Sequence, residues 1–541
     1  MLKRFFSICM ILIFAVSMLP MGCAEENGHV EVLYIGTTAE PTVFNILLES
    51  GSFGRMNYNA FCAAPFVVND ERGFAQPFIM TDWEISEDQK TMTATFATDQ
   101  GITWHDGEPL TIEDIVFTFE YLINVKKATY TRGITSVEAL DDKTVLFTFE
   151  GQTPFYVVNK MAMAVYVIPK HIWESVEDYN NYTEADAAIG CGPFKLVDID
   201  MEAQVLTYES VCDTYLGREV TVDKVVLRTY DSQNALAMAV RSGEIDAVYD
   251  YSNSLDPSMK SSLESTENVD AGRSDNPGNF TLMFGMNVQP TDDLAFRKAV
   301  SLALDYSLLA GAIGGEDGQI ANTGSLPPAA NGYDASLPLN TTDLEEAAKI
   351  LDEAGYLDVD GDGWREMPDG SEMDVLITPL ASKSRIELYM RICEIVEENL
   401  ANVNVKATLD EESVRNSDHC QEVRTSAMYE IYIGYNSPGV NMLTTGIQYI
   451  VPGSVPTYLE GTCHDQDFID AFQLARAANN VDEYNERMSK LQHMISENVY
   501  AICLCADSAY FPYRTDKYEG WINFPGYGVI NNQTWYTVHT K

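Results

Sequence analysis

The sequence predicts a mixed α/β fold, because segments with the pattern of β-strands alternate with segments that have the pattern of α-helices. Thr91–Phe96 alternates polar and apolar residues, as a half-buried strand does, whereas Ile115, Val116, Phe119 and Leu122 fall on one helical face. The chain has 541 residues, 46% of them apolar, which is enough for a large buried core. At roughly 150 residues per unit, this length predicts about three domains or subdomains.

Three elements are expected early in the chain. Val30–Thr37 has the composition of an opening strand. Thr111, followed by two acidic residues, predicts the start of the helix that carries the apolar face described above. Val137–Leu140 and Thr144–Phe149, which flank an Asp-Asp turn, predict a β-hairpin.

A helix-turn-strand unit is expected near the middle of the chain. Asp231 or Ser232 is suited to begin the helix, and Gly243 is suited to end it, since glycine readily takes the left-handed conformation of a helix C-terminus. Ile245–Tyr249 then predicts a returning strand.

Thr342 and Glu345 form the pattern of a capping box, which predicts a helix that runs to Gly355. Further helices are expected at Ser384–Leu400 and Val481–Glu497. The chain has no internal repeat and no linker rich in Pro, Gly and Ser. If it has two lobes, they are therefore connected by several crossings.

The formal net charge of −47 argues against two classes of partner. Proteins that bind nucleic acid need clustered Lys and Arg, and adsorption to anionic lipid also needs basic residues. The acidic residues are spread along the chain, which favours a solvated, mutually repelling surface over a specific site for cations.

The first 22 residues are expected to be a signal peptide. Lys3 and Arg4 precede an apolar run, Phe5–Leu19, that is too short to span a membrane. Gly22 and Cys23 resemble the lipobox of bacterial lipoproteins, in which the Cys becomes the lipidated N-terminus, although Pro20 stands where that motif prefers Leu. Ordinary cleavage near Cys23 is the alternative. No later stretch is long and apolar enough to span a membrane, so the rest is expected to be soluble.

Eight cysteines follow Cys23, which is sparse for an exported chain and indicates a fold that does not depend on disulfides. Cys420 and Cys463 are the first candidates for a pair. Cys503 and Cys505 alternate along an apolar strand and would point to opposite faces. The connectivity stays open at this point, because spacing does not determine it.

Signatures of enzymes are missing from the sequence. It has no G-x-S-x-G elbow, no phosphate-binding loop and no H-E-x-x-H motif. His419 with Cys420, and Cys463 with His464, do not have the spacings of zinc ligands and are expected to be structural. We therefore predict that the protein is not an enzyme.

One loop has the pattern of a calcium site. Asp358, Asp360 and Asp362 stand at positions one, three and five of a twelve-residue loop, Trp364 offers its carbonyl, and Asp369 stands at position twelve. Glu366 occupies the ninth place. The alternative is a turn rich in Asp and Gly that is held by hydrogen bonds from side chains to the backbone. Any calcium bound here is expected to be structural.

Six segments, in order along the mature chain, resemble motifs of the family 5 extracellular solute-binding proteins, which are the peptide, dipeptide and nickel binders of ABC importers. The two closest matches are a "W-x-x-S-x-D" turn and a "W-H-D-G-x-P-L-T" segment. The six segments are Trp83–Asp88, Ile102–Ile115, Gly190–Phe194, Ser242–Asp246, Arg297–Asp305 and Ala354–Gly363.

This resemblance implies a two-lobed periplasmic-binding-protein-like fold of the large type, with an inserted subdomain and the ligand in the cleft between the lobes. Lobe I would comprise residues 23–60, 181–279 and 507–541, the inserted subdomain 61–180, and lobe II 280–506. It also implies permease and ATPase partners, an extracytoplasmic location and capture of the ligand by hinge closure. We expect a monomer that needs no cofactor.

The resemblance further implies that the ligand is an extended peptide, held by its backbone beside strands of both lobes. In the family's peptide binders an Asp pairs with the ligand's α-ammonium, and here Gly434 holds that place. Glu40 is the candidate substitute, and a turn-capping role for it is the alternative. The residues expected to line the ligand are Thr38, Glu40, Ile433, Gly434, Tyr435 and Asn436. A non-peptide solute (an oligosaccharide, an amino compound or a metal complex) and a sensor without transport remain open.

Overall fold

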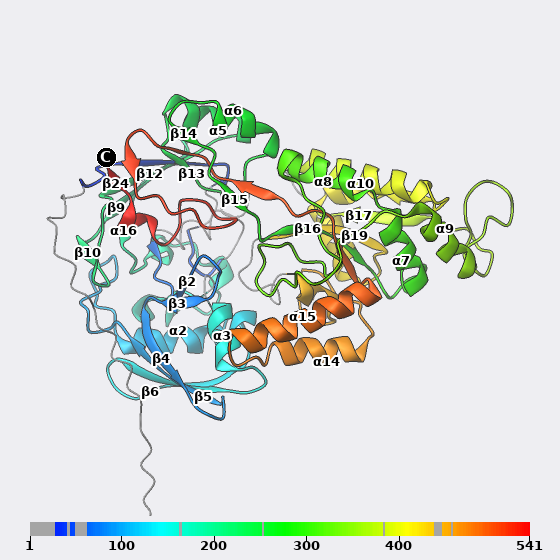
Figure 1. Ribbon diagram of the computed structural model, residues 1–541. Coiled ribbons are helices and arrows are strands. Elements are labelled where there is room, and N and C mark those ends of the chain that lie inside the picture. Colours follow the sequence, from blue (N-terminus) through cyan, green and yellow to red (C-terminus); the bar gives the residue numbers. More distant parts are fainter. Residues whose placement is uncertain are drawn as a thin grey trace, which may run out of the picture.

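The computed structural model describes residues 28–40, 44–48, 62–161, 165–250, 254–381, 385–437, 446–455 and 458–541. The predicted signal peptide and Cys23 lie outside these residues. The described chain forms two lobes side by side, which confirms the mixed α/β prediction (Figure 1). Among the described helices, none has both the length and the apolar character needed to cross a membrane.

Lobe I is built on a seven-stranded sheet that takes strands from both ends of the chain. Its central strand, β1 (Leu33–Thr37), runs parallel to β12 (Lys224–Thr229) on one side and to β13 (Ala247–Val248) on the other. The remaining strands are β8 (Phe194–Asp200), β9 (Val205–Ser210), β14 (Val269–Asp270) and β22 (Tyr513–Arg514). Smaller elements are β10 (Thr214–Tyr215), β11 (Arg218–Glu219), β23 (Tyr518–Glu519), β24 (His539–Thr540), α6 (Lys260–Glu264) and α16 (Thr534–Thr537).

The predicted helix-turn-strand unit is confirmed in this lobe. Helix α5 (Gln233–Ser242) begins after Ser232, whose side chain accepts a hydrogen bond from the Ala235 amide. It ends at Gly243, which has the left-handed conformation (φ 80°) that favours glycine. The chain then returns as β13 beside β1.

The inserted subdomain contains a four-stranded antiparallel sheet in the order β4-β5-β7-β6. The predicted hairpin is its β6–β7 pair. The predicted helix start at Thr111 is confirmed at α2, where a capping box forms: the Asp114 carboxylate accepts from the Thr111 amide at 2.9 Å. The elements are β2 (Val67–Asn69), β3 (Ala75–Pro77), β4 (Met80–Ile85), β5 (Thr91–Phe96), β6 (Ile134–Ala139), β7 (Thr144–Phe149), α2 (Ile112–Asn124), α3 (Pro154–Met161) and α4 (Lys170–Trp173).

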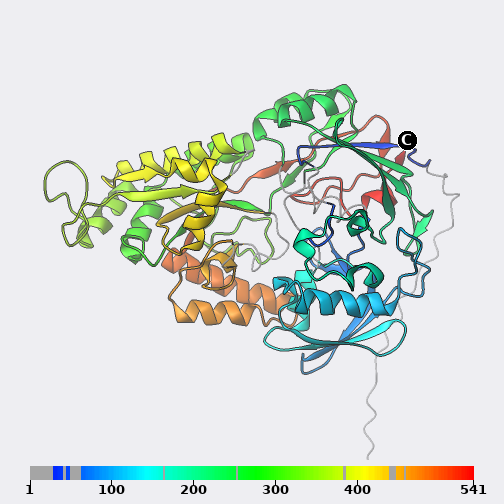
Figure 2. The same cartoon turned by 180° about the vertical axis from the view of Figure 1, so that it is seen from behind.

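Lobe II, with its yellow and orange helices, lies on the left in Figure 2. It contains a five-stranded sheet in the order β18-β17-β19-β16-β20. Its strands are β16 (Asn279–Phe284), β17 (Val375–Pro379), β18 (Ala407–Leu409), β19 (Ile431–Asn436) and β20 (Ala501–Cys503). Its helices are α7 (Leu294–Ala303), α8 (Tyr306–Gly314), α9 (Leu344–Glu353), α10 (Ile386–Ala401), α11 (Glu411–Arg415), α12 (Ser417–Thr425), α14 (Gln466–Ala475) and α15 (Val481–Asn498).

Two sequence-based predictions for lobe II are wrong. Helix α9 is capped by Asp343, whose carboxylate accepts from the Glu346 amide, while the Thr342 hydroxyl donates to the Leu304 carbonyl. The expected pair Cys420–Cys463 is not formed, and all eight described cysteines are free. Cys420 is instead held beside β17, where its thiol donates to the Pro379 carbonyl at 3.5 Å.

Two segments connect the lobes, and they pair with each other. β15 (Arg273–Asp275) leads from lobe I into β16, and β21 (Ser508–Tyr510) returns from β20. The two strands form an antiparallel ribbon with Ser274 opposite Ala509. A rotation of one lobe against the other would act on this ribbon, as in proteins whose domains close about a hinge.

Candidate functional site

The structure gathers three polar residues from different elements where the two connecting segments meet. Asn276, just after β15, donates to the Asp507 carboxylate at 2.8 Å and to the Tyr435 hydroxyl at 3.2 Å. Asn276 is 4% exposed, so its amide forms a buried bridge between both connecting segments and strand β19. Its own carbonyl oxygen accepts from the Gly278 amide, which leaves the side chain well anchored.

Asp507 and Arg385 line a cavity of about 290 Å³ between the lobes. The Arg385 guanidinium lies 4.6 Å from the centre of the Tyr435 ring and 5.8 Å from that of Phe280, within range of a cation–π contact. The cavity's lining residues come from lobe I, the connecting segments and lobe II: Gln233, Ser254, Leu255, Asp256, Pro257, Asn276, Phe280, Ile313, Arg385, Ile386, Glu387, Leu388 and Asp507.

Burial raises the pKa of Asp507 to about 7, while the Asn276 amide and the Arg385 charge partly oppose that rise. Removing a carboxylate from water penalises its charged form, and a nearby cation favours it. A cation that entered the cavity would therefore be attracted to a carboxylate that the protein alone leaves only partly stabilised.

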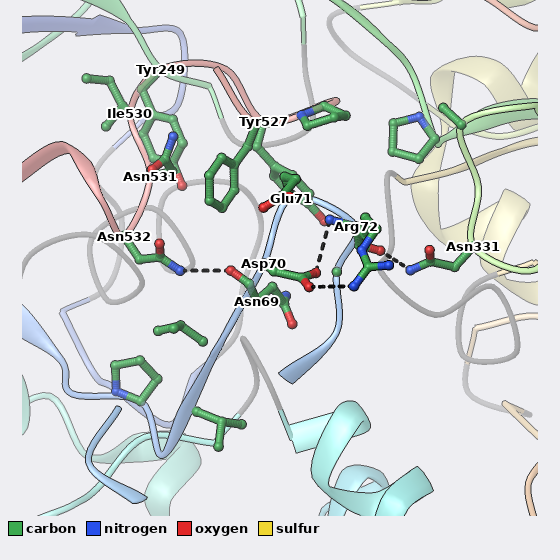
Figure 3. Close-up of a pocket in the computed structure, with 18 residues that line it drawn as sticks. Asn69, Asp70, Glu71, Arg72, Tyr249, Asn331, Tyr527, Ile530, Asn531 and Asn532 are labelled. Carbon is green, nitrogen blue, oxygen red and sulfur yellow. Dashed lines mark hydrogen bonds and ion pairs between the residues drawn. The ribbon is translucent and has the colours of Figure 1, made fainter. Parts of the chain in front are cut away.

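A second cavity, of about 70 Å³, lies where the β2–β3 turn meets the C-terminal segment (Figure 3). Tyr249 of lobe I and Asn331 of lobe II also line it. The side-chain amide of Asn69 is buried there, and neither of its polar atoms has a hydrogen-bond partner among the described residues. Waters satisfy such groups in many proteins.

The candidate residues of β1 lie at the edge of lobe I. Thr38 follows β1 and donates a hydrogen bond to the Asp250 carboxylate, which follows β13. Because β1 and β13 are parallel, their carboxyl ends meet at one edge of the sheet. Glu40, two residues further on, is exposed.

The candidate residues of β19 divide between the core of lobe II and the polar network at the connecting segments. Ile433 is fully buried in the core of lobe II. The Asn436 amide donates to Asn279 at 3.1 Å and to Thr281 at 2.7 Å, so it holds β19 against β16. Tyr435 contacts two residues that line the interlobe cavity: its hydroxyl accepts from Asn276, and its ring lies beneath the Arg385 guanidinium.

Gly434 is closely covered by its neighbour. A Cβ atom added to Gly434 would lie 2.6 Å from Cε1 of Tyr432, whose side chain is 1% exposed. Two carbon atoms that are not bonded to each other do not approach this closely, so any side chain at this position requires Tyr432 to move.

Among the described residues, strand pairing on the β17 side of β19 ends at Ile433. Strand β17 pairs with Ile431–Ile433 only, while β16 pairs with β19 along its whole length. Among the described residues, no strand lies beside Gly434–Asn436 on the β17 side. An extended chain could add there by backbone hydrogen bonds.

Four carboxylates of the candidate calcium loop lie close together, and Glu366 takes the place expected for Asp369. Single oxygens of Asp358, Asp360, Asp362 and Glu366 lie within 4.8 Å of one another. Glu366 is buried, and its carboxylate also accepts from the Val359 amide at 2.7 Å. The carboxylate of Asp369 lies outside this group.

Asp369 instead accepts from the amide and hydroxyl of Ser371 in the next turn. The first three Asp side chains also accept from backbone amides of their own loop, as a simple Asp/Gly turn would require. Trp364 is 37% exposed beside them.

Two lobes on a paired hinge, with a polar cavity between them, define a binding protein of the hinged type. Residues 75–453 match the family described as "Bacterial extracellular solute-binding proteins, family 5 Middle", and the chain belongs to this family. The predicted family and the predicted two-lobed fold are thereby confirmed. Members of the family bind solutes outside the cytoplasm and are not enzymes.

Similar proteins bind several kinds of solute. The dipeptide-binding protein DppE of Bacillus subtilis is 24% identical over 304 residues, which cover 52% of this chain and 53% of DppE. The chain thus matches about half the length of the first such relatives. The oligopeptide-binding protein AppA of B. subtilis, solved with a nonapeptide, has a TM-score of 0.74 at 18% identity and covers 95% of this chain and 100% of its own. NikZ of Campylobacter jejuni, solved with Ni(L-His), has a TM-score of 0.75 at 19% identity over 94% and 99%.

Sequence reasoning missed Asn276, Arg385 and Asp507. They stand more than a hundred residues apart in the chain, outside any of the matched motifs. The pairing of the two connecting segments brings Asn276 and Asp507 together, and Arg385 reaches the same cavity from the start of α10.

Proposed function

We propose that this protein is the substrate-binding component of an ABC importer and captures peptides by closure of its two lobes. The observation that carries this proposal is that no described strand pairs with Gly434–Asn436 of β19 on the β17 side, beside the Tyr435–Asn276–Asp507 network. A peptide backbone satisfies such an edge without regard to its side chains. The closed complex would then be delivered to a membrane permease. The names of DppE and AppA support the peptide assignment.

The lobes would follow the boundaries that the sequence predicted: residues 23–60, 181–279 and 507–541 for lobe I, 61–180 for the inserted subdomain and 280–506 for lobe II. The chain passes from lobe I into lobe II between β15 and β16, close to residue 279, and returns between β20 and β21, close to residue 507. Thr38 and Glu40 would face the ligand from lobe I, and the backbone of Gly434–Asn436 would face it from lobe II, whereas Ile433 is buried in the core.

Native purification followed by unfolding tests the proposal. The mature protein is purified without denaturation, washed and unfolded, and the released small molecules are analysed by mass spectrometry. Peptides of mixed sequence support the proposal. A single non-peptide species overturns the peptide assignment, while the proposed role as a solute receptor stands. That second candidate, a receptor or sensor for another solute, is favoured by the glycine at position 434 and by the Ni(L-His) complex of NikZ.

A lipid anchor at Cys23 would hold the protein at the outer face of the cytoplasmic membrane. It is supported by the apolar run and by Gly22–Cys23. Incorporation of a labelled fatty acid by the wild type, and its loss in Cys23→Ala, tests this anchor. Equal labelling of both proteins would contradict it.

The carboxylates of Asp358, Asp360, Asp362 and Glu366 would hold a structural calcium ion. Three or four negatively charged oxygens on one loop suit the oxygen preference of Ca²⁺. Terbium, which substitutes for calcium, would be excited through the nearby Trp364, so its luminescence on titration reports binding. No luminescence, or luminescence that excess calcium does not displace, would contradict the site.

A further inference from the structure

The place that would hold an acid for the ligand's amine is closed in this protein. Gly434 carries no side chain, and the buried Tyr432 ring occupies the space that a side chain would need. An ammonium that loses its water on entering the cleft still needs a negative partner, because an unpaired buried charge is costly. The partner must therefore come from another element.

Asp507 is connected to this place by a short chain of hydrogen bonds. Its carboxylate accepts from Asn276, and the same Asn276 amide donates to the hydroxyl of Tyr435, the residue next to Gly434. Asp507 also lines the cavity between the lobes. Among the described residues, Asn276 is the side chain that donates to this carboxylate, and the Asp507 amide also donates to it, so the carboxylate keeps capacity to accept from a ligand.

The charges around Asp507 are arranged for a ligand that carries both signs. Arg385 lies in the same cavity and is held over the Tyr435 ring. The pKa of Asp507 remains raised to about 7 although Arg385 and Asn276 oppose the effect of burial. An ammonium beside Asp507 would favour its charged form and lower that pKa.

The two other carboxylates of the cavity are less suited to this role. Asp256 is exposed, and its side chain already accepts from the Ser258 amide at the start of a short helical turn. Glu387 is exposed in the first turn of α10. Water competes with a ligand for an exposed carboxylate, which makes such pairs weak.

We propose that Asp507 is the specificity-determining residue that pairs with a free ammonium group of the ligand, in the place of an acid at position 434. This inference rests on the proposed capture of peptides, and it identifies the amino end of the peptide as the part that Asp507 recognises. The solutes are then short peptides or amino compounds with an unblocked amine, and the same peptides with an acetylated amine are rejected.

Calorimetric titration of the ligand-free mature protein tests the proposal. The two probes are an equimolar pool of di-, tri- and tetra-alanine and the same pool with acetylated N-termini. We expect the wild type to bind the free peptides at least ~30-fold more tightly than the acetylated ones, as for other pairs of buried charges. Asp507→Asn should reduce this ratio to about 3-fold or less, while Asp507→Glu retains most of it. Asp256→Asn, in the wall of the same cavity, is the matched control and should leave the ratio unchanged.

The outcomes separate this inference from the function on which it rests. If the wild type binds both pools equally, or if Asp507→Asn still prefers free amines, the role of Asp507 is overturned while peptide capture stands. If the wild type binds neither pool, both fail. Far-ultraviolet circular dichroism and the unfolding midpoint of each variant show that it is folded, and Asp507→Glu provides a second variant should Asp507→Asn not fold.

Discussion

Replacing Asp507 by Asn should change how the stability of the ligand-free protein depends on pH. The pKa of Asp507 in the folded protein is about 7, whereas the ordinary value is 3.8. Between these values the folded state keeps a proton that the unfolded state releases. The free energy of unfolding therefore falls as pH rises from about 4 to about 7, since stability decreases wherever the folded state binds more protons.

The size of the effect follows from the shift. A difference of about 3 pH units corresponds to an upper limit of about 4 kcal/mol. Asp507 is only partly buried and faces the cavity, so screening by water reduces this figure. We expect about 2 kcal/mol. Arg385, Tyr435, Cys503 and Cys505 face Asp507, and the exposed carboxylates of Asp256 and Glu387 line the same cavity. Burial raises the pKa of Tyr435, Cys503 and Cys505, which keeps these three groups neutral in this pH window.

Urea unfolding of ligand-free protein at pH 5 and pH 8 measures this difference. From pH 5 to pH 8, the free energy of unfolding of Asp507→Asn should rise by about 2 kcal/mol relative to that of the wild type. Asp334→Asn is a control of opposite sign. Hydrogen bonds from Ser336 and Ser489 lower the pKa of Asp334 to about 2, so its stabilisation is complete above about pH 4 and is lost only as pH falls through about 2.

The Asp334 variant should consequently be less stable than the wild type by a similar amount, about 2 kcal/mol, at both pH 5 and pH 8. A free-energy difference between Asp507→Asn and the wild type that is the same at pH 5 and pH 8, or that shrinks as pH rises, would refute the reasoning.

Three further predictions concern lobe II. Arg297 is 5% exposed and donates hydrogen bonds to four backbone carbonyls. Arg297→Met should therefore lower the free energy of unfolding, measured by urea titration, by about 3 kcal/mol. The control variant Arg391→Met, at an exposed position, should change it by less than ~0.5 kcal/mol. Gly434→Ala should cost about 1–3 kcal/mol in the same assay, because the added methyl group contacts Tyr432, and an unchanged midpoint would show that this ring moves freely. Asp360→Asn should weaken terbium binding about 10-fold in a luminescence titration, and equal affinities would remove Asp360 from the site.

Local elements were predictable from the sequence where side chains and backbone satisfy each other within a few residues. The box at Thr111 and Asp114 and the cap at Ser232 are of this kind. The start of α9 was misplaced by one residue because two adjacent residues, Thr342 and Asp343, are both good caps. The choice between them depends on the Leu304 carbonyl, which engages the Thr342 hydroxyl and which no local pattern contains.

The carboxylate loop shows the same limit at a candidate site. The spacing of Asp358, Asp360 and Asp362 was enough to bring them together. The fourth carboxylate comes from Glu366 because its side chain turns inward to the Val359 amide, while Asp369 is engaged by Ser371. A motif fixes the order of residues along the chain, whereas the direction of each side chain depends on which nearby donor binds it.

The interlobe site was beyond local reasoning, because it depends on the pairing of two connecting segments, and this placement also explains why an acid there can serve binding. If the lobes rotated about the β15–β21 ribbon, Tyr435 and Arg385 would move with lobe II, whereas Asp507, next to the ribbon, would be displaced least. An ammonium could therefore reach Asp507 while the cleft is open. Closure would then bring the edge of β19 onto a ligand that is already held at one end. Much of the entropy that the ligand loses on binding would therefore be lost before the lobes close.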